Sequence, residues 1–486
     1  MKVSIIGSGV SGISAAIRLR SKGFDVEVYE KNTMPGGKLN TFKLDRFRFD
    51  AGPSLFTMPQ LVDELFEINN LNPRDYFTYK KKKIHCKYFW DDKTKFTAYS
   101  NRKKFLKEVK NKFKVDESVV DKYLKRAKIK YDLTEKIFLR KSLHKLSSFL
   151  NIETIKALFN LNIFQINKTL NEVNSDELKN KYLIQIFDRY ATYNGSSPYK
   201  TPGMMTLIQH LENHYGTFVP EGGMYEITNA LFNLAKQIGV KFYFGCNVDE
   251  IIIEKKAAKK IRVNNNLIES DIIISNVDVN FTYKNLIKQK FNHRSLKNES
   301  SSSALIFYWG IKGTYDKLDL HNIFFSSNYK EEFNSIFEKK QIFDDPTVYV
   351  NISCKDVSSD APKGSENWFV MINSPYNINQ NWDRQIQISR KKIINKLEKI
   401  LGMEIGKNIL KEKVYSPIDL ESNTNSFNGS LYGSSSNNIM SSFMRHPNFT
   451  KKIKNLFFCG GSVHPGGGIP LAILSSKIVS DLIESE

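Results

Sequence analysis

A strand, a glycine-rich turn and a helix follow one another at the start of the chain. The apolar run 3–6 leads into the sequence G-S-G-V-S-G at 7–12, and apolar residues then recur at helical spacing over 13–19. A second apolar run, 26–29, is followed by Glu30, eighteen residues after the last of the three glycines. All parts of the dinucleotide-binding fingerprint are in register, which predicts a Rossmann-like βαβ unit.

Each glycine of this turn has a physical role. Gly7 permits the tight turn, Gly9 lets a pyrophosphate approach the backbone, and Gly12 lets the helix pack closely on the strand. The helix N-terminus adds unpaired N–H groups and the positive end of a dipole. Glu30 would accept hydrogen bonds from ribose hydroxyls and would repel a 2′-phosphate, so NADP is disfavoured.

Two further glycine-rich segments favour a larger cofactor. Gly36 and Gly37 free the backbone for a second approach to the pyrophosphate, which suits FAD better than NAD. Near the C-terminus an apolar run at 455–458 enters glycines, and a helix is predicted over 471–483. Pro470 suits the first turn of this helix, whose positive end would face the negative charge of a reduced flavin.

Length and composition predict a globular protein with two linked domains. The chain has 486 residues, too many for one ordinary core, with 41% hydrophobic and 25% charged residues. Its four cysteines, Cys86, Cys246, Cys354 and Cys459, form no C-x-x-C pair. We therefore expect free thiols in a reducing cytoplasm and no metal site.

The net charge of +21 implies an anionic partner. Residues 101–150 hold 16 Lys or Arg against 6 Asp or Glu, and apolar residues continue from this basic stretch to residue 164. The pattern fits either an amphipathic element on anionic lipid or helices whose apolar face is core, and it leaves both open. No nucleic-acid-binding motif accompanies the lysines, so no nucleic acid is expected.

No run of 18 apolar residues occurs, and the predicted location is cytoplasmic, peripheral to the inner face of the membrane.

Six further segments form a pattern that spans the chain. They are 30–37, F-D-A-G-P-S at 49–54, Y-N-G-S-S-P-Y at 193–199, P-E-G-G-M-Y at 220–225, S-N-V-D at 275–278, and 459–470. In this order they resemble the FAD-dependent carotenoid desaturases of the bacterial phytoene desaturase type. One departure is Lys38, where many relatives in the wider amine oxidase-like group carry Arg; Lys keeps the charge but loses the bidentate geometry.

The resemblance implies an α/β fold of the amine oxidase or phytoene desaturase type. It would combine a Rossmann-like FAD-binding domain with an interleaved α+β substrate domain and a basic, amphipathic helical membrane-contact region. The FAD-binding domain would comprise 1–80, 215–289 and 415–486. The substrate domain would comprise 81–214, which includes the membrane-contact region, and 290–414.

The resemblance also implies one noncovalently bound FAD. The expected cofactor-binding residues lie in the glycine turns, after the F-D-A-G-P motif and near the C-terminus, with the backbone of Val248 against the adenine. They are Gly7, Gly9, Val10, Ser11, Gly12, Glu30, Lys31, Gly36, Gly37, Lys38, Pro53, Ser54, Leu55, Val248, Asn276, Leu431, Gly460, Gly461, Gly467, Gly468, Ile469 and Pro470.

Catalytic side chains are harder to assign, because the sequence shows no nucleophile motif, metal-ligand cluster or carboxylate pair. A flavin oxidises by accepting a hydride, so the protein need only hold a C–H bond over the ring and give a proton an exit. His464 could accept a proton, but a histidine in a glycine-rich turn is more often structural. Asp188 and Arg189 are a second candidate pair, with a buried structural ion pair as the alternative.

The predicted activity is desaturation of a carotenoid. Residues 461–471 are more similar to the 1-hydroxycarotenoid 3,4-desaturases than to phytoene desaturases, which stay the alternative. A flavin-dependent carotenoid isomerase and a non-catalytic flavin-binding protein also suit the fold. A hydroxylated substrate end would need a polar partner in an apolar tunnel, because leaving it unpaired costs about 1–3 kcal/mol. The aromatic residues that could line this tunnel, or equally form ordinary core, are Phe307, Tyr308, Trp309, Tyr349, Trp368 and Phe369.

Overall fold

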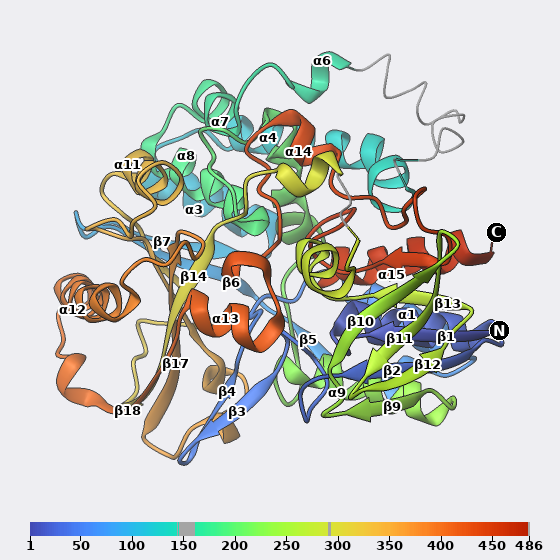
Figure 1. Cartoon of the computed structure of the whole chain (residues 1–486). Coiled ribbons are helices and arrows are strands. Elements are labelled where there is room, and N and C mark those ends of the chain that lie inside the picture. Colours follow the sequence, from blue (N-terminus) through green and yellow to red (C-terminus); the bar gives the residue numbers. More distant parts are fainter. Residues whose placement is uncertain (143, 145–160, 290–292, 485–486) are drawn as a thin grey trace.

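The computed structural model describes residues 1–142, 144, 161–289 and 293–484. Two sheets form the centres of two lobes, and the chain passes between the lobes several times (Figure 1). The first helix, α1 (Val10–Ser21), and the C-terminal helix, α15 (Ile469–Glu484), pack against each other in the same lobe. Both ends of the chain therefore contribute to one core.

The first lobe is built on a five-stranded parallel sheet in the order β19-β13-β1-β2-β9. Its strands are β1 (Lys2–Ile6), β2 (Asp25–Glu30), β9 (Lys241–Phe244), β13 (Ile272–Ser275) and β19 (Leu456–Phe458). β13 is buried along its whole length, as expected for a parallel strand that is covered on both faces. Three distant parts of the sequence thus supply one sheet, and the predicted Rossmann-like arrangement is confirmed.

Helices pack on one face of this sheet and a small antiparallel sheet lies near the other. The helices are α1 (Val10–Ser21), α2 (Gln60–Glu67), α9 (Tyr225–Gln237) and α15 (Ile469–Glu484). The small sheet comprises β10 (Val248–Glu254), β11 (Ala257–Val263) and β12 (Asn266–Glu269), and packs with residues of β13 and β19. The final helix, predicted over 471–483, is present.

The second lobe is built on a seven-stranded mixed sheet in the order β18-β14-β17-β16-β15-β6-β7. Its strands are β6 (Ile84–Phe89), β7 (Lys95–Tyr99), β14 (Ser303–Lys312), β15 (His321–Phe324), β16 (Val348–Ile352), β17 (Ser365–Ser374) and β18 (Ile409–Tyr415). The long helix α12 (Trp382–Leu401) covers one face, where its apolar side chains form a core with those of β14, β16 and β17. The boundaries predicted for the domain segments stay a prediction.

Five helices surround the β6–β7 edge of this sheet. They are α3 (Arg102–Phe113), α4 (Glu117–Thr134), α7 (Leu170–Leu178), α8 (Lys181–Asp188) and α11 (Tyr329–Phe337). The apolar side chains of α3 and α4, such as Phe105 and Leu124, are buried in the core of this lobe. Of the two interpretations of the basic stretch, the core interpretation therefore holds for 102–134. Most of the apolar segment that follows lies outside the described residues.

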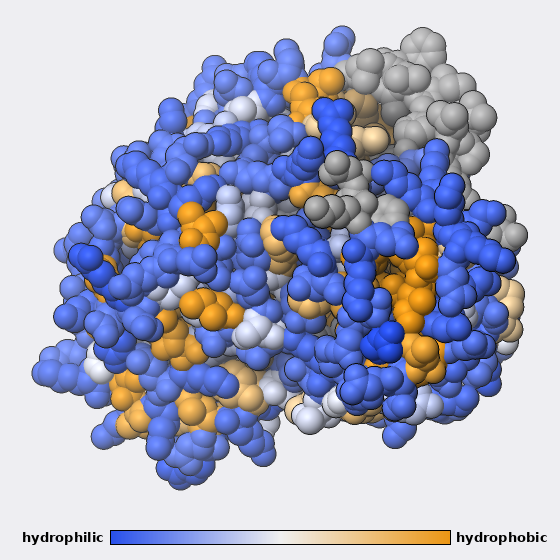
Figure 2. Space-filling model, viewed as in Figure 1, coloured by the Kyte–Doolittle hydropathy of each residue, from blue (hydrophilic) through white to orange (hydrophobic). Residues whose placement is uncertain are grey.

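Further short elements lie between these helices and strands along the chain. They are β3 (Thr41–Leu44), β4 (Phe47–Asp50), β5 (Tyr79–Lys81), β8 (Phe218–Pro220), α6 (Leu161–Phe164), α10 (Val279–Phe281), α13 (Pro417–Thr424) and α14 (Ile439–Phe443). The face shown in Figure 2 is mostly hydrophilic, with separate hydrophobic groups, one of them at the top beside the residues drawn in grey. Within the described part of the chain, no helix combines the length and apolar character that crossing a membrane requires.

Candidate active site

One large cavity extends between the lobes. Its volume is about 1000 Å³, and its lining combines the glycine turns of the first lobe with the seven-stranded sheet of the second. Every residue predicted to bind the cofactor lines this cavity except Gly12. The fold thus gathers residues from distant parts of the sequence at one site. Their individual contacts with a cofactor stay predictions.

The two N-terminal glycine turns lie directly against each other. Gly36 N–H donates to the carbonyl oxygen of Ser8 at 2.9 Å, and a Cβ added to Gly37 would lie 3.4 Å from the Cα of Gly9. A Cβ on Gly12 would overlap the carbonyl oxygen of Gly7, so this glycine serves helix packing, as predicted from its place in the motif. The result is an open cradle of backbone at the N-terminus of α1.

Glu30 stands at the end of β2 and already accepts four hydrogen bonds. Its Oε2 accepts from the N–H and the hydroxyl of Ser8, at 2.8 and 2.9 Å. Its Oε1 accepts from the backbone and side-chain nitrogens of Asn32, at 2.9 and 2.8 Å. A carboxylate has about four lone-pair directions. A ribose hydroxyl would therefore have to replace one of these four donors. The side-chain amide of Asn32 is the donor that can rotate away from the carboxylate most easily.

Lys38 is buried between the cavity and a C-terminal loop. Its ammonium donates to the carbonyl oxygens of Ser430 and Leu431, at 3.3 and 2.6 Å. Burial lowers the pKa of Lys38 to about 8, and the nearby Asp278 carboxylate acts in the opposite direction. The side chain thus positions the 430–431 backbone at the cavity as well as supplying positive charge.

The N-terminus of α15 faces the same cavity. The helix begins at Ile469, so Pro470 occupies its first turn, as predicted. Gly467 and Gly468 precede the helix and also line the cavity. A Cβ on Gly467 would overlap the ring of Tyr432, which is itself part of the lining. A substitution at this glycine would therefore act by displacing Tyr432.

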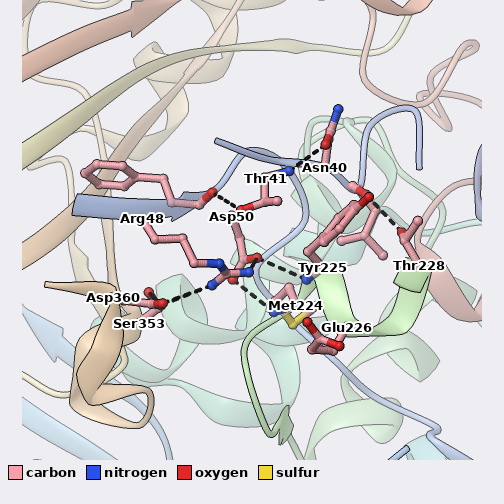
Figure 3. Close-up of polar contacts among 12 residues, drawn as sticks. Asn40, Thr41, Arg48, Asp50, Met224, Tyr225, Glu226, Thr228, Ser353 and Asp360 are labelled. Carbon is pink, nitrogen blue, oxygen red and sulfur yellow. Dashed lines mark hydrogen bonds and ion pairs between the residues drawn. The ribbon is translucent and has the colours of Figure 1, made fainter. Parts of the chain in front are cut away.

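Asp50 anchors the F-D-A-G-P-S segment (Figure 3). Its carboxylate accepts hydrogen bonds from the backbone N–H groups of Met224 and Tyr225 at the start of α9, at 2.9 and 3.0 Å. It also accepts from Arg48 at 2.7 Å, and Arg48 donates to Asp360 at 3.1 Å. One buried carboxylate therefore joins the loop that enters the cavity to both lobes.

His464 lines the cavity, but its imidazole is already bonded. Nε2 lies 2.9 Å from the carbonyl oxygen of Lys141, so Nε2 carries the proton and donates it. Burial lowers the pKa of His464 to about 3, which makes the neutral ring a weak proton acceptor. These contacts favour the structural role, and a catalytic role stays a prediction.

Asp188 and Arg189 are adjacent in sequence but bind different partners. Asp188 accepts hydrogen bonds from the side-chain amides of Asn171 and Asn174, at 2.6 and 2.8 Å. Burial raises the pKa of Asp188 to about 7. Arg189 begins a 3₁₀ turn (Arg189–Asn194) and lines the cavity, whereas Asp188 is outside the lining. Of the two, only Arg189 is placed to contact a ligand.

The seven-stranded sheet forms the wall of the cavity opposite the glycine turns. In β14, Ala304, Ile306 and Tyr308 line the cavity, while the alternating residues pack against α12. The aromatic residues considered for a tunnel therefore divide between two environments. Tyr308, Tyr349 and Phe369 line the cavity, and Phe307, Trp309 and Trp368 belong to the core under α12.

Several polar residues of the lining carried no signal in the sequence. They are His85, Glu212 and His321, from three separate segments. None of them stands in a recognisable sequence motif. The fold brings them together with Arg189.

Comparison with known proteins assigns the chain to a family. The model of the family described as flavin containing amine oxidoreductase matches residues 10–483. The chain belongs to this family. A putrescine oxidase structure with bound putrescine has a TM-score of 0.65 at 11% identity, covering 100% of both chains. An oxidoreductase structure from Methanosarcina mazei has a TM-score of 0.64 at 15% identity, covering 100% of both chains. At these identities the likeness shows the fold.

Two relatives are similar in sequence over nearly their whole length. A 1-hydroxycarotenoid 3,4-desaturase of Flavobacterium sp. strain P99-3 is 47% identical over 483 residues, which cover 99% of each chain. A 4,4′-diaponeurosporene oxygenase of Staphylococcus aureus strain Mu50 is 33% identical over 489 residues, 99% of this chain and 98% of the relative. The predicted resemblance to carotenoid desaturases is confirmed.

The protein is an FAD-dependent oxidoreductase, as predicted. The residues present fit FAD, because the paired glycine turns leave backbone open at the N-terminus of α1, and the N-terminus of α15 faces the same cavity. Ser11 Oγ, in the first turn of α1, is buried beside the Cys459 thiol and has no stronger hydrogen-bond partner among the described residues. The segments 7–11 and 36–38 would hold the pyrophosphate, and 467–470 the flavin.

Proposed function

We propose that this protein desaturates a carotenoid and that its preferred reaction is 3,4-desaturation of a 1-hydroxycarotenoid. The observation that carries the proposal is the 47% identity, over 99% of both chains, to a relative of that name. The cavity supports it, because it continues from the cofactor cradle along aromatic and aliphatic side chains. Such a lining suits a long hydrocarbon.

FAD supplies the oxidation when bound, by accepting a hydride from a C–H bond of the substrate. The chain's own residues then have to hold the polyene and exclude water. Tyr308 and Phe369 give the sheet side of the cavity flat apolar surface, and Tyr432 lies beside Gly467 at the end of α15. Because His464 is bonded to a carbonyl and is a weak base, positioning is the main contribution that the protein makes to the reaction.

The substrate would enter at α14. Phe138 and Phe443 line the cavity there, with their ring centroids 5.3 Å apart. On the outer side of α14, Ile439 and Met440 are each 48% exposed. These exposed apolar side chains beside the cavity favour extraction of the substrate from lipid, and the excess of lysine favours an anionic membrane surface.

The activity is tested with FAD-loaded enzyme and liposomes that contain a 1-hydroxycarotenoid, lycopene or phytoene. We expect a red-shifted absorption spectrum and a product two hydrogens lighter, formed fastest from the hydroxylated substrate. A product of unchanged mass would indicate an isomerase, and a product that has gained an oxygen atom relative to its substrate would indicate an oxygenase. Either result, or turnover of phytoene alone, would overturn the proposal.

Membrane contact is tested by flotation with anionic liposomes. We expect Met440→Glu to reduce flotation, because it puts a charge where an apolar side chain would enter lipid. Leu410→Glu is the matched control, since Leu410 is 50% exposed on β18. Added salt and the substitutions Lys136→Glu and Lys141→Glu should also reduce flotation. Equal flotation of the Met440 and Leu410 variants would argue against entry at α14.

A further inference from the structure

A charged cluster is buried at the substrate side of the cavity. Arg189 donates from Nη1 to the hydroxyl of Tyr193 and from Nη2 to that of Tyr88, both at 3.0 Å. Its counter-ion is Glu212, 3.4 Å from Nη2. Glu212 also accepts hydrogen bonds from the hydroxyls of Tyr190 and Tyr193, at 3.0 and 2.6 Å. The carboxylate is therefore fully occupied by its neighbours.

The guanidinium of Arg189 is less fully occupied. A guanidinium has five N–H donors and is always charged. Its Nε is buried without a hydrogen-bond partner among the residues that the structure describes. The side chain lies deep in the protein and lines the cavity, yet 11% of its surface is accessible. The open part of the side chain therefore faces the cavity. A pure hydrocarbon against this open part of the side chain would displace water and offer no hydrogen-bond acceptor, which is unfavourable.

The cluster lies close to the loop that is expected to contact the flavin. Nδ1 of His321 lies 2.7 Å from the hydroxyl of Tyr349, which lies 2.7 Å from Oγ of Ser54. Burial lowers the pKa of His321 to about 3, and the charges of Glu212 and Arg189 act on it in opposite directions. The connection from Arg189 to this loop runs across neighbouring strands: its partner Tyr88 on β6 stands opposite Ile323 on β15, which stands opposite Tyr349 on β16.

We propose that Arg189 binds a hydroxyl group at the end of the carotenoid substrate and thereby selects hydroxylated over hydrocarbon polyenes. Glu212 and Tyr193 act as positioning residues that hold the guanidinium toward the cavity. This inference rests on the proposed function. In a 1-hydroxycarotenoid, the hydroxyl-bearing C1 is only two carbon–carbon bonds from C3, so its partner must lie near the cofactor. The position of Arg189 meets this requirement, because its partner Tyr88 and the Ser54 partner Tyr349 stand on the two strands that flank β15.

The first experiment uses the unaltered protein and needs no variant. FAD-loaded enzyme is given a 1-hydroxycarotenoid or the same polyene without its hydroxyl, and kcat/KM is measured for each. We expect a preference of about 10- to 100-fold for the hydroxylated substrate, the range that corresponds to leaving a buried polar group unpaired. Equal kcat/KM values would overturn the inference and leave carotenoid desaturation standing. Desaturation of neither polyene would instead refute the proposed function.

The second experiment removes the charge and its counter-charge together, so that no uncompensated charge is left buried. We expect the double variant Arg189→Met/Glu212→Gln to lose the preference, with kcat/KM falling about 10- to 100-fold for the hydroxylated substrate and less than threefold for the other. Tyr193→Phe, which removes only one hydroxyl, should reduce the preference in the same direction. A preference that persists in both variants, at equal FAD occupancy, would overturn the inference.

The matched control is a second ion pair, outside the cavity lining, in which the lysine is buried and the aspartate is partly exposed. Lys396 on α12 pairs with Asp345 at 2.6 Å, and the lysine side chain is 6% exposed. The double variant Lys396→Met/Asp345→Asn should lower stability without changing the preference between the two polyenes. If this control lost the preference as well, general loss of packing would explain the result and the role of Arg189 would be refuted.

Discussion

Asp50→Asn is predicted to weaken the connection between the two lobes. Asp50 accepts two backbone hydrogen bonds at the start of α9 and one from Arg48, while Arg48 also bonds Asp360. Asparagine has the same shape but a single acceptor oxygen, and its amide would face either the Arg48 donors or the helix N–H groups. Donors that face one another, together with the lost charge, cost about 3 kcal/mol.

A loss of this size lowers the melting temperature by roughly 3 °C, because the unfolding entropy of a chain of 486 residues is about 1 kcal/mol/K. Thermal unfolding of FAD-loaded protein, followed by circular dichroism and by release of flavin fluorescence, measures it. Because the Asp50 segment leads to Ser54 at the cavity, we also expect reduced FAD content after purification. Glu221→Gln is the control, since Glu221 lies in the neighbouring turn and its pair with Lys80 at 2.9 Å is largely exposed; it should cost less than about 0.5 kcal/mol. A D50N protein that melts like the control and keeps its FAD would refute the reasoning.

Three other predictions follow from the site. Gly9→Val should abolish FAD binding while the protein stays folded. Undiminished flavin absorbance of this variant would contradict the proposal that the backbone at Gly9 binds the pyrophosphate. Gly467→Val should remove activity by displacing Tyr432. His464→Ala should slow turnover by less than the roughly 10²–10⁴-fold that is typical of a lost general acid or base. A His464→Ala enzyme that keeps its FAD but shows no turnover would identify His464 as the catalytic base. Burial raises the pKa of Asp188 to about 7, so the folded state keeps a proton that the unfolded chain releases near its ordinary value of 3.8. Stability should therefore fall as pH rises from about 4 to 7, by up to about 1.4 kcal/mol per unit, and denaturant unfolding of Asp188→Asn should lack this slope.

The cofactor side of the site could be predicted from sequence because its signals are local. A glycine turn between a strand and a helix, followed by Glu30, determines the positions of several cofactor-binding groups within thirty residues. The glycine turn before α15 does the same for the residues at the start of that helix. The wall of the substrate cavity could not be predicted in this way. In β14 both faces are apolar, since one packs under α12 and the other faces a cavity for a hydrocarbon. The alternation of apolar and polar residues that normally separates core from surface is therefore missing. Whether each aromatic side chain faces the core or the cavity depends on the tertiary fold.

The pair Asp188 and Arg189 shows what a sequence can and cannot say about a polar site. Successive residues of a helical turn point in different directions, so side chains at neighbouring positions do not face each other. Helical geometry thus argues against an ion pair between them and places one toward α7 and the other toward the cavity. The partner of Arg189 is Glu212, which reaches it from another helical segment. Only the fold shows that this pair stands beside His321 and Tyr349, and this placement turns a buried ion pair into a candidate for recognition of a substrate hydroxyl.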